Sequence, residues 1–104
     1  MSLYINGIDI SNNVTNTITT GTTLTSSYRT VLCDATIAPF TVTLPAASTS
    51  KYQIYTIKKI DATGNSITIT PNGVETIDLN LNKVLNSQNV SISIQSDGAN
   101  WDII

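Results

Sequence analysis

Short alternations of apolar and polar residues recur along the chain, and they predict β-strands. In residues 55–58 and 66–70, apolar side chains occupy every second position, which is the period of a strand with one buried face. Between these runs, residues 61–65 read Asp-Ala-Thr-Gly-Asn, and these residue types favour a turn. The pattern predicts a β-hairpin that spans residues 55–70 and forms the centre of the fold.

The same period returns after residue 28 and predicts a series of further strands. Their spacing, about eight to twelve residues, is typical of an antiparallel sandwich or barrel. The expected strands cover residues 28–33, 40–44, 51–60, 67–70, 76–81, 84–85, 90–94 and 101–104. The strand order stays open, because Greek-key and up-and-down arrangements share these signals.

Two of these strands carry expectations about individual side chains. The apolar positions of residues 51–60 cannot all share one face, so we expect a bulge near residues 58–59. The strand that contains Ile77 alternates regularly, so we expect Ile77, Leu79 and Leu81 to point inward.

The first 27 residues have a different pattern of apolar and polar positions. Their apolar runs are short and separated by Ser, Thr and Asn, with a hairpin signal at Asn6-Gly7. Residues 15–25 are rich in Thr, which fits either ordered extended chain or a flexible linker. We predict an all-β protein in which residues 1–27 form an extended segment. Residues 28–104 would form an antiparallel β-sandwich of jelly-roll-like or Greek-key type.

Composition and charge narrow the range of partners. The chain has 104 residues, enough for one domain, and only 12% of them are charged, about half the usual ~25%. Its net charge of -2 disfavours a nucleic-acid partner, which needs a basic face. Lys58 and Lys59 are adjacent strand residues, so their side chains point to opposite faces and form no basic patch. No apolar run reaches bilayer length, and the N-terminus lacks the profile of a secretion signal.

The residues needed for the common catalytic arrangements are scarce. The chain has no histidine, which excludes Ser-His-Asp and Cys-His catalysis and metal sites built on histidine. Cys33 is the only cysteine, and its apolar neighbours indicate a buried thiol that behaves as a small hydrophobe. We therefore predict that the protein is not an enzyme and has no cofactor or metal site.

Three groups of side chains are candidate sites. The corner formed by residues 97–101, Asp-Gly-Ala-Asn-Trp, offers a sugar-binding geometry, but a turn with a core tryptophan is the preferred interpretation. Asp61 and Asp78 would serve glycoside hydrolysis if paired, yet each follows a strand-end Ile where Asp commonly forms turns. Tyr52 and Tyr55 would form an aromatic strip, but one buried tyrosine and one at a subunit contact is preferred.

Five stretches, taken in order, resemble a known family: VTLPAAS, YTIKKID, ITITPNG, TIDL and QSDGANWDII. They resemble a repeat-like terminal domain of tail fibres and other fibrous structural proteins in bacteriophages, giant viruses and virophages. The resemblance covers about residues 28–104. That family usually has Asp-Gly after Thr-Ile, whereas here Leu79 follows Asp78, so we expect continued strand where the family has a turn.

The resemblance implies a trimeric head domain at the end of a virion fibre, with residues 1–27 as the connection next to the shaft. The family brings no catalytic residues. Our first hypothesis is therefore a non-enzymatic virion protein used for display or for attachment to a host or a host particle, through a glycan or protein ligand that stays unknown. The alternative is a monomeric carbohydrate-binding β-sandwich module that uses Trp101.

Overall fold

The computed structural model describes residues 4–5, 8–9 and 15–104, and their regular structure is almost entirely β-strand. The strands are β1 (Tyr4–Ile5), β2 (Ile8–Asp9), β3 (Thr15–Ile18), β4 (Thr22–Thr23), β5 (Thr30–Cys33), β6 (Phe40–Thr43), β7 (Ile54–Lys59), β8 (Ile67–Thr70), β9 (Lys83–Leu85), β10 (Ser91–Ser96) and β11 (Trp101–Ile103). One short 3-10 helix, η2, covers Ala47–Thr49. The predicted all-β class is confirmed. No helix among the described residues has the length and apolar character needed to span a bilayer.

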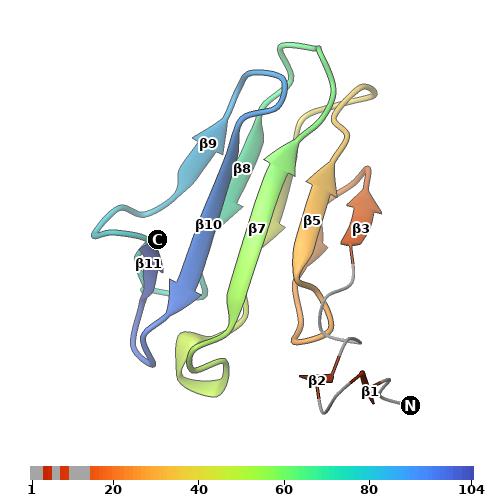
Figure 1. Ribbon diagram of the computed structural model, residues 1–104. Coiled ribbons are helices and arrows are strands. Elements are labelled where there is room, and N and C mark those ends of the chain that lie inside the picture. The colour runs from red at the N-terminus through yellow and green to blue at the C-terminus, as the bar shows by residue number, and fades with distance from the viewer. Residues whose placement is uncertain (1–3, 6–7, 10–14) are drawn as a thin grey trace.

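Two sheets form the body of the molecule and lie in two layers (Figure 1). One sheet has five strands in the order β11-β10-β7-β5-β3, and the other has four in the order β4-β6-β8-β9. The inward side chains of both sheets meet in a single apolar cluster. This burial explains the alternation in the sequence, since every second residue of strands β5, β7 and β8 is buried.

The predicted antiparallel pairing is wrong for most of the molecule. Strands β3, β5 and β7 are parallel to one another, and so are β4, β6 and β8. In the two large sheets, antiparallel pairing is confined to the contacts made by β9, β10 and β11. The cause is the path of the chain, which alternates between the two sheets from β3 to β8. Each strand therefore enters its sheet in the same direction as the strand two places earlier.

This alternation stacks three coils, formed by β3–β4, β5–β6 and β7–β8. It also overturns the predicted hairpin over residues 55–70, because β7 and β8 lie in different sheets. Residues 60–66 cross from one sheet to the other. Asp61 ties this crossover to the coil before it, since its Oδ1 accepts the N–H of Ala35 at 2.7 Å. A turn-forming sequence between two strands is equally suited to a hairpin and to a crossover, which is why the alternation alone misassigned it.

Strand β7 has no bulge, and the predicted one near residues 58–59 is wrong. Its residues alternate without interruption and pair in continuous register with β5 and β10. The inward position expected to hold an apolar residue holds Lys59, which is 0% exposed. Lys58 points to the opposite face, as predicted. The buried ammonium of Lys59 pairs with the Asp61 carboxylate. The strand can therefore stay regular without leaving an unpaired charge in the core.

Residues 76–81 do not form the predicted strand. Ile77 is buried, as expected, but Leu79 is 93% and Leu81 is 76% exposed. Asp78 and Leu79 have positive φ angles of 49° and 67°, and Ile77 and Asn80 exchange two backbone hydrogen bonds of 2.9 Å. This is a two-residue reversal of the kind that Asp-Gly usually forms. The expected continued strand is therefore wrong, and Leu79 occupies the position that glycine would fill.

The N-terminal part of the chain contributes to a separate two-stranded sheet and to both large sheets. Strands β1 and β2 pair antiparallel, while Asn6 and Gly7, where the hairpin turn was predicted, lie outside the described residues. The Thr-rich residues 15–25 contain β3 and β4, and Ile18 and Leu24 belong to the core. The predicted boundary between residues 27 and 28 stays a prediction about domain organisation.

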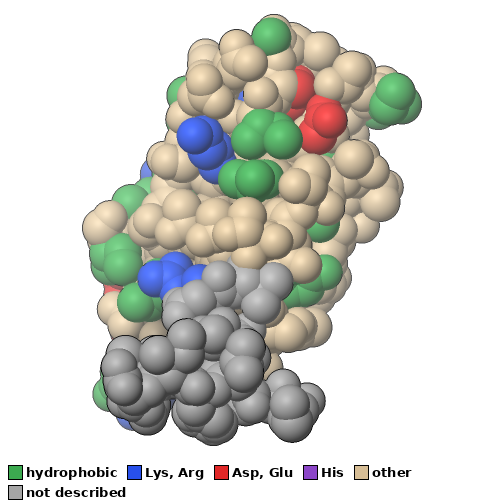
Figure 2. All heavy atoms as spheres, turned by 45° about the vertical axis from the view of Figure 1, so that its right-hand side comes forward, with side chains coloured by type: hydrophobic (Ala, Val, Ile, Leu, Met, Phe, Trp, Pro, Cys, Tyr) green, Lys and Arg blue, Asp and Glu red, His purple; other side chains and the backbone are tan. Residues whose placement is uncertain are grey.

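The core contains two aromatic rings in contact, one from β7 and one from β11 of the five-stranded sheet. Tyr55 and Trp101 are both fully buried, and their ring centroids lie 5.6 Å apart. The Tyr55 hydroxyl donates a hydrogen bond of 2.9 Å to the carbonyl of Thr25. Outside this core, the face shown in Figure 2 carries scattered acidic, basic and apolar side chains among polar ones, with no gathered patch of one kind in its described part.

Candidate functional site

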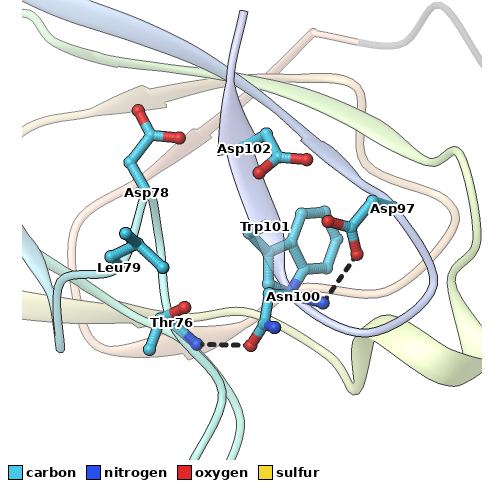
Figure 3. Close-up of a pocket in the computed structure, with 7 residues that line it drawn as sticks. All are labelled: Thr76, Asp78, Leu79, Asp97, Asn100, Trp101 and Asp102. Carbon is cyan, nitrogen blue, oxygen red and sulfur yellow. Dashed lines mark hydrogen bonds between the residues drawn. The ribbon is translucent and has the colours of Figure 1, made fainter.

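A pocket of about 350 Å³ lies where the connection between β8 and β9 meets the end of the five-stranded sheet. Two segments of the chain build it: residues 76–79, which precede β9, and residues 97–102, which form the β10–β11 turn and the start of β11. Figure 3 shows Thr76, Asp78 and Leu79 on one side of the pocket, facing the residues of the second segment. Its lining residues are Thr76, Asp78, Leu79, Asp97, Asn100, Trp101 and Asp102.

The β10–β11 turn is held by its own first residue. The Oδ1 atom of Asp97 accepts the backbone N–H groups of Ala99 and Asn100, both at 2.8 Å. Gly98 has a φ angle of 94°, and a Cβ there would lie 3.3 Å from the stem of Lys51. The predicted turn is confirmed, and only glycine fits its second position without strain.

The other wall is attached to the edge of β11. Trp101 donates its backbone N–H to Thr76 at 2.9 Å, and Asp78 donates its own to Trp101 at 3.0 Å. The Asn100 side chain accepts the N–H of Thr76 at 3.0 Å, and Asp78 Oδ1 accepts that of Ile103 at 3.1 Å. These four bonds satisfy the outer edge of the sheet and hold Asp78 and Leu79 across from Asp97 and Asp102 (Figure 3).

The pocket is negatively charged. Asp78, Asp97 and Asp102 line it, and the one salt bridge among the described residues lies elsewhere, between Lys59 and Asp61. Hydrogen bonds from the backbone of Asn100 and Ala99 lower the pKa of Asp97. Burial and the neighbouring Asp97 raise the pKa of Asp102. The described residues offer no group of three or more acidic, His or Cys side chains arranged to hold a metal ion. The pocket is therefore suited to a ligand rich in hydrogen-bond donors.

Leu79 stands at the rim of this pocket in an unfavourable conformation. A left-handed φ costs a residue with a Cβ roughly 1–2 kcal/mol relative to the right-handed region. Burial does not compensate for this cost, because the Leu79 side chain is 93% exposed. Backbone strain of this kind is concentrated at functional sites.

Trp101 is a core residue. Its side chain is 0% exposed, which confirms the predicted core tryptophan and removes its ring as a platform for stacking on a sugar. The indole Nε1 of Trp101 is buried and has no hydrogen-bond partner. Buried donors are rarely left unpaired in proteins.

Of the two candidate tyrosines, one is buried and the other is exposed, as predicted. Tyr55 is buried, and burial raises its pKa to about 12. Tyr52 is 64% exposed, has a φ angle of 67°, and carries the Lys51 ammonium 5.2 Å from its ring centroid. The subunit contact expected for this second tyrosine stays a prediction.

The other candidate residues have structural positions. Asp61 accepts hydrogen bonds from Ala35, Thr63 and Lys59 at the inter-sheet crossover, and it does not line the pocket that contains Asp78. Cys33 is buried, as predicted. Its pKa is raised to about 12 by burial and by the nearby Asp61 charge.

The convergence of Asp78 with Asp97 and Asp102 was missed in the sequence. The only signal for it is the Asp that follows Thr-Ile, which marks a tight turn but not the strand that the turn contacts. A scan against known protein families finds none that matches this chain, and a search of curated proteins finds no similar sequence.

Proposed function

We propose that this chain is a non-enzymatic structural protein of a virion, the terminal head domain of a fibre, which assembles as a homotrimer and serves display or host attachment. The observation that carries the proposal is that the two outer edges of the five-stranded sheet differ. At one edge, the described residues leave β3 paired on one side only. At the other, Thr76 and Asp78 cover the outer edge of β11.

The open end has the geometry needed for continuation. Strands β5 and β7 stack on β3 in parallel, so a further parallel strand fits the free edge of β3 in the same way. Exposed sheet edges are otherwise a liability that proteins blunt with charges or proline, and β3 contains neither. A five-stranded sheet with one open edge, at β3, and one covered edge, at β11, is suited to the tip of a fibre, where contacts are needed on one side only.

The apolar surface also favours assembly. Several large apolar side chains of the described part are more than two-fifths exposed, namely Ile37, Tyr52, Val74, Leu79, Leu81, Val84, Val90 and Ile104. Burial between copies would remove this surface from water. The trimer itself comes from the family resemblance. The non-enzymatic character is supported by the raised pKa of Cys33 and by the structural contacts of Asp61.

The test is the solution mass, measured by light scattering on a sizing column across a hundredfold dilution. A stable mass of three 11.1 kDa chains is expected. Thr17→Lys places a charge on the free edge of β3 and should lower the mass, whereas Thr41→Lys, an equally exposed position on the central strand β6, should not. A stable single-chain mass for the unmodified protein would contradict the proposal. The monomeric alternative that stacks sugars on Trp101 is disfavoured, because that ring is buried.

A further inference from the structure

The connection between β8 and β9 begins with an exposed Asn-Gly pair, Asn72-Gly73. The N–H of Glu75 donates to the carbonyl of Asn72 at 3.0 Å and closes a tight turn. Gly73 is the second residue of this turn and has a φ angle of 53°. Asn72, Gly73 and Val74 are all exposed, and the exposed fraction of Val74 reaches 97%. The side chain of Asn72 and the peptide that follows it are therefore open to water.

The surroundings of Gly73 leave its backbone nitrogen free to react. Glycine has no Cβ, so the side chain of the preceding asparagine can approach this nitrogen, and the local backbone rotates easily. A Cβ built at Gly73 would meet no atom within 4 Å beyond its chain neighbours. The N–H of Gly73 has no acceptor among the residues that the structure describes. No hydrogen bond within this part of the chain therefore has to break before the nitrogen can attack.

Other asparagines of the described part are held more firmly. Asn100 accepts the N–H of Thr76 at 3.0 Å, and the N–H of the next residue, Trp101, is bonded to the carbonyl of Thr76. Asn65 donates to the carbonyl of Ala35 at 2.8 Å and is followed by a serine. Exposure, a following glycine and an unbonded nitrogen coincide only at residues 72–73 of the described chain.

We propose that Asn72 is a site of spontaneous deamidation, at which the folded chain converts this residue to aspartate and isoaspartate. The nitrogen of Gly73 attacks Cγ of Asn72 and forms a C–N bond, and the side-chain amide leaves as ammonia with the proton from that nitrogen. Water then opens the succinimide ring. Cleavage between the nitrogen and Cγ gives aspartate. Cleavage between the nitrogen and the main-chain carbonyl carbon gives isoaspartate, whose main chain runs through the former side chain.

The isoaspartate product affects a contact between two connections of the fold. The Glu75 carboxylate accepts the N–H of Ala47, the first residue of η2, at 3.1 and 3.2 Å. Ala47 is fully buried, and its carbonyl accepts the hydroxyl of Ser96 at 2.8 Å. Isoaspartate adds one carbon atom to the main chain of the turn that holds Glu75, so it should weaken this contact. Aspartate keeps the length of the main chain and should leave the contact in place.

The experiment follows deamidation of the full, folded chain by tryptic digestion and mass spectrometry with fragmentation. Trypsin releases residues 60–83 as one peptide, separate from the other Asn-Gly pair at residues 6–7, which lies outside the described residues. A synthetic peptide of residues 68–77 gives the rate without the fold. The rate at Asn72 in the folded chain should lie within about tenfold of the peptide rate, since an exposed turn opens at almost no cost in free energy. Asn80 and Asn82, in the same tryptic peptide, should react far more slowly.

Variants test the assigned atoms. Gly73→Ala places a Cβ beside the attacking nitrogen and should slow the reaction. Gly64→Ala is the matched control, because a Cβ there also meets no atom within 4 Å, and it should leave the rate at Asn72 unchanged. Asn72→Ser removes the reacting amide without changing Gly73, and it should abolish modification at this position. Heat denaturation of each variant verifies that it is folded.

Two results would overturn the inference: an unchanged rate in Gly73→Ala, or a rate in the folded chain more than about tenfold below that of the peptide. A reaction that required global unfolding would be slowed at least about a thousandfold.

The structural consequence has its own test. The isoaspartate form, isolated by ion exchange, should unfold at a lower temperature than the Asn72→Asp variant, which carries the same added charge on a main chain of normal length. Equal unfolding midpoints for the two proteins would show that the turn does not support the contact between Glu75 and Ala47.

Discussion

The Nζ atom of Lys59 lies 2.5 Å from Oδ2 of Asp61, and both side chains are buried at the point where the chain leaves β7 for the opposite sheet. Lys59 occupies an inward position of the strand, where an apolar residue would be expected from the alternation. Asp61 supplies the missing charge and also accepts the N–H of Ala35 in the preceding coil. This pair therefore joins two successive coils as well as neutralising a core lysine.

Breaking the pair from the acidic side should destabilise the fold strongly. Asp61→Asn leaves the Lys59 ammonium buried without a counter-charge, and we expect the midpoint of thermal unfolding to fall by roughly ten degrees or more. Circular dichroism during heating measures it. The double variant Lys59→Met with Asp61→Asn removes the buried charge and should recover much of the loss. A double variant no more stable than Asp61→Asn alone would show that the charge is not the cause.

Acid should remove the contribution of Asp61. Burial alone would raise the pKa of this carboxyl, but hydrogen bonds from Lys59, Thr63 and Ala35 hold it far below its ordinary value of 3.8. A carboxyl with a lowered pKa in the folded state stabilises the protein above its unfolded pKa, and this stability is lost as the pH falls below about 4. Urea unfolding at pH 7, 4, 3 and 2 should show a steep decrease for the unmodified chain.

The Asp61→Asn variant supplies the control for this pH dependence. It cannot titrate at this position, so its free energy of unfolding should decrease less between pH 4 and pH 2 than that of the unmodified chain. Equal slopes for the two proteins would mean that other carboxyls cause the acid sensitivity.

Leu79→Gly should stabilise the fold even though it removes a side chain. Glycine adopts the positive φ of this turn freely, and Asp-Gly is a preferred pair for such a reversal. We expect a gain of about 1 kcal/mol in the free energy of unfolding, measured with urea. Leu81→Gly is the matched control, since Leu81 is also exposed but has no positive φ angle. It should lose about 0.5–1 kcal/mol.

The same Leu79→Gly variant separates folding from assembly. If Leu79 is kept for contacts between copies of the chain, the more stable variant should have a lower solution mass at the same protein concentration. A variant that is both less stable and unchanged in solution mass would show that the leucine is there for the fold.

Cys33 should be inert while the protein is folded. Its thiol is fully buried, and its pKa of about 12 leaves almost no thiolate at pH 8. Iodoacetamide at this pH should modify the native chain only as fast as the chain unfolds, and it should modify the urea-unfolded chain completely. Rapid modification under native conditions would indicate that the β5 end of the core opens locally.

Only part of the candidate site follows from the sequence. The turn over residues 97–100 was predicted, because Asp and Gly in that order favour a tight reversal wherever they occur. Its meeting with Asp78 was not predicted, since that contact depends on the connection between β8 and β9 lying along β11. The inward prediction for Leu79 failed for a related reason. Alternation of apolar residues describes a straight strand, and two positive φ angles reverse the chain within it.

The sequence by itself determined where most of the strands lie and which of their faces are buried. Val42, Ile57, Ile67, Ile69 and Ile94 all occupy predicted strands and are fully buried, because each strand must hide its apolar face whatever its partner. The tertiary structure alone decided the pairing of the strands, their parallel direction, and the place of Lys59 in the core. Backbone hydrogen-bonding groups are chemically the same in every strand, so the choice of partner depends on how the whole core packs.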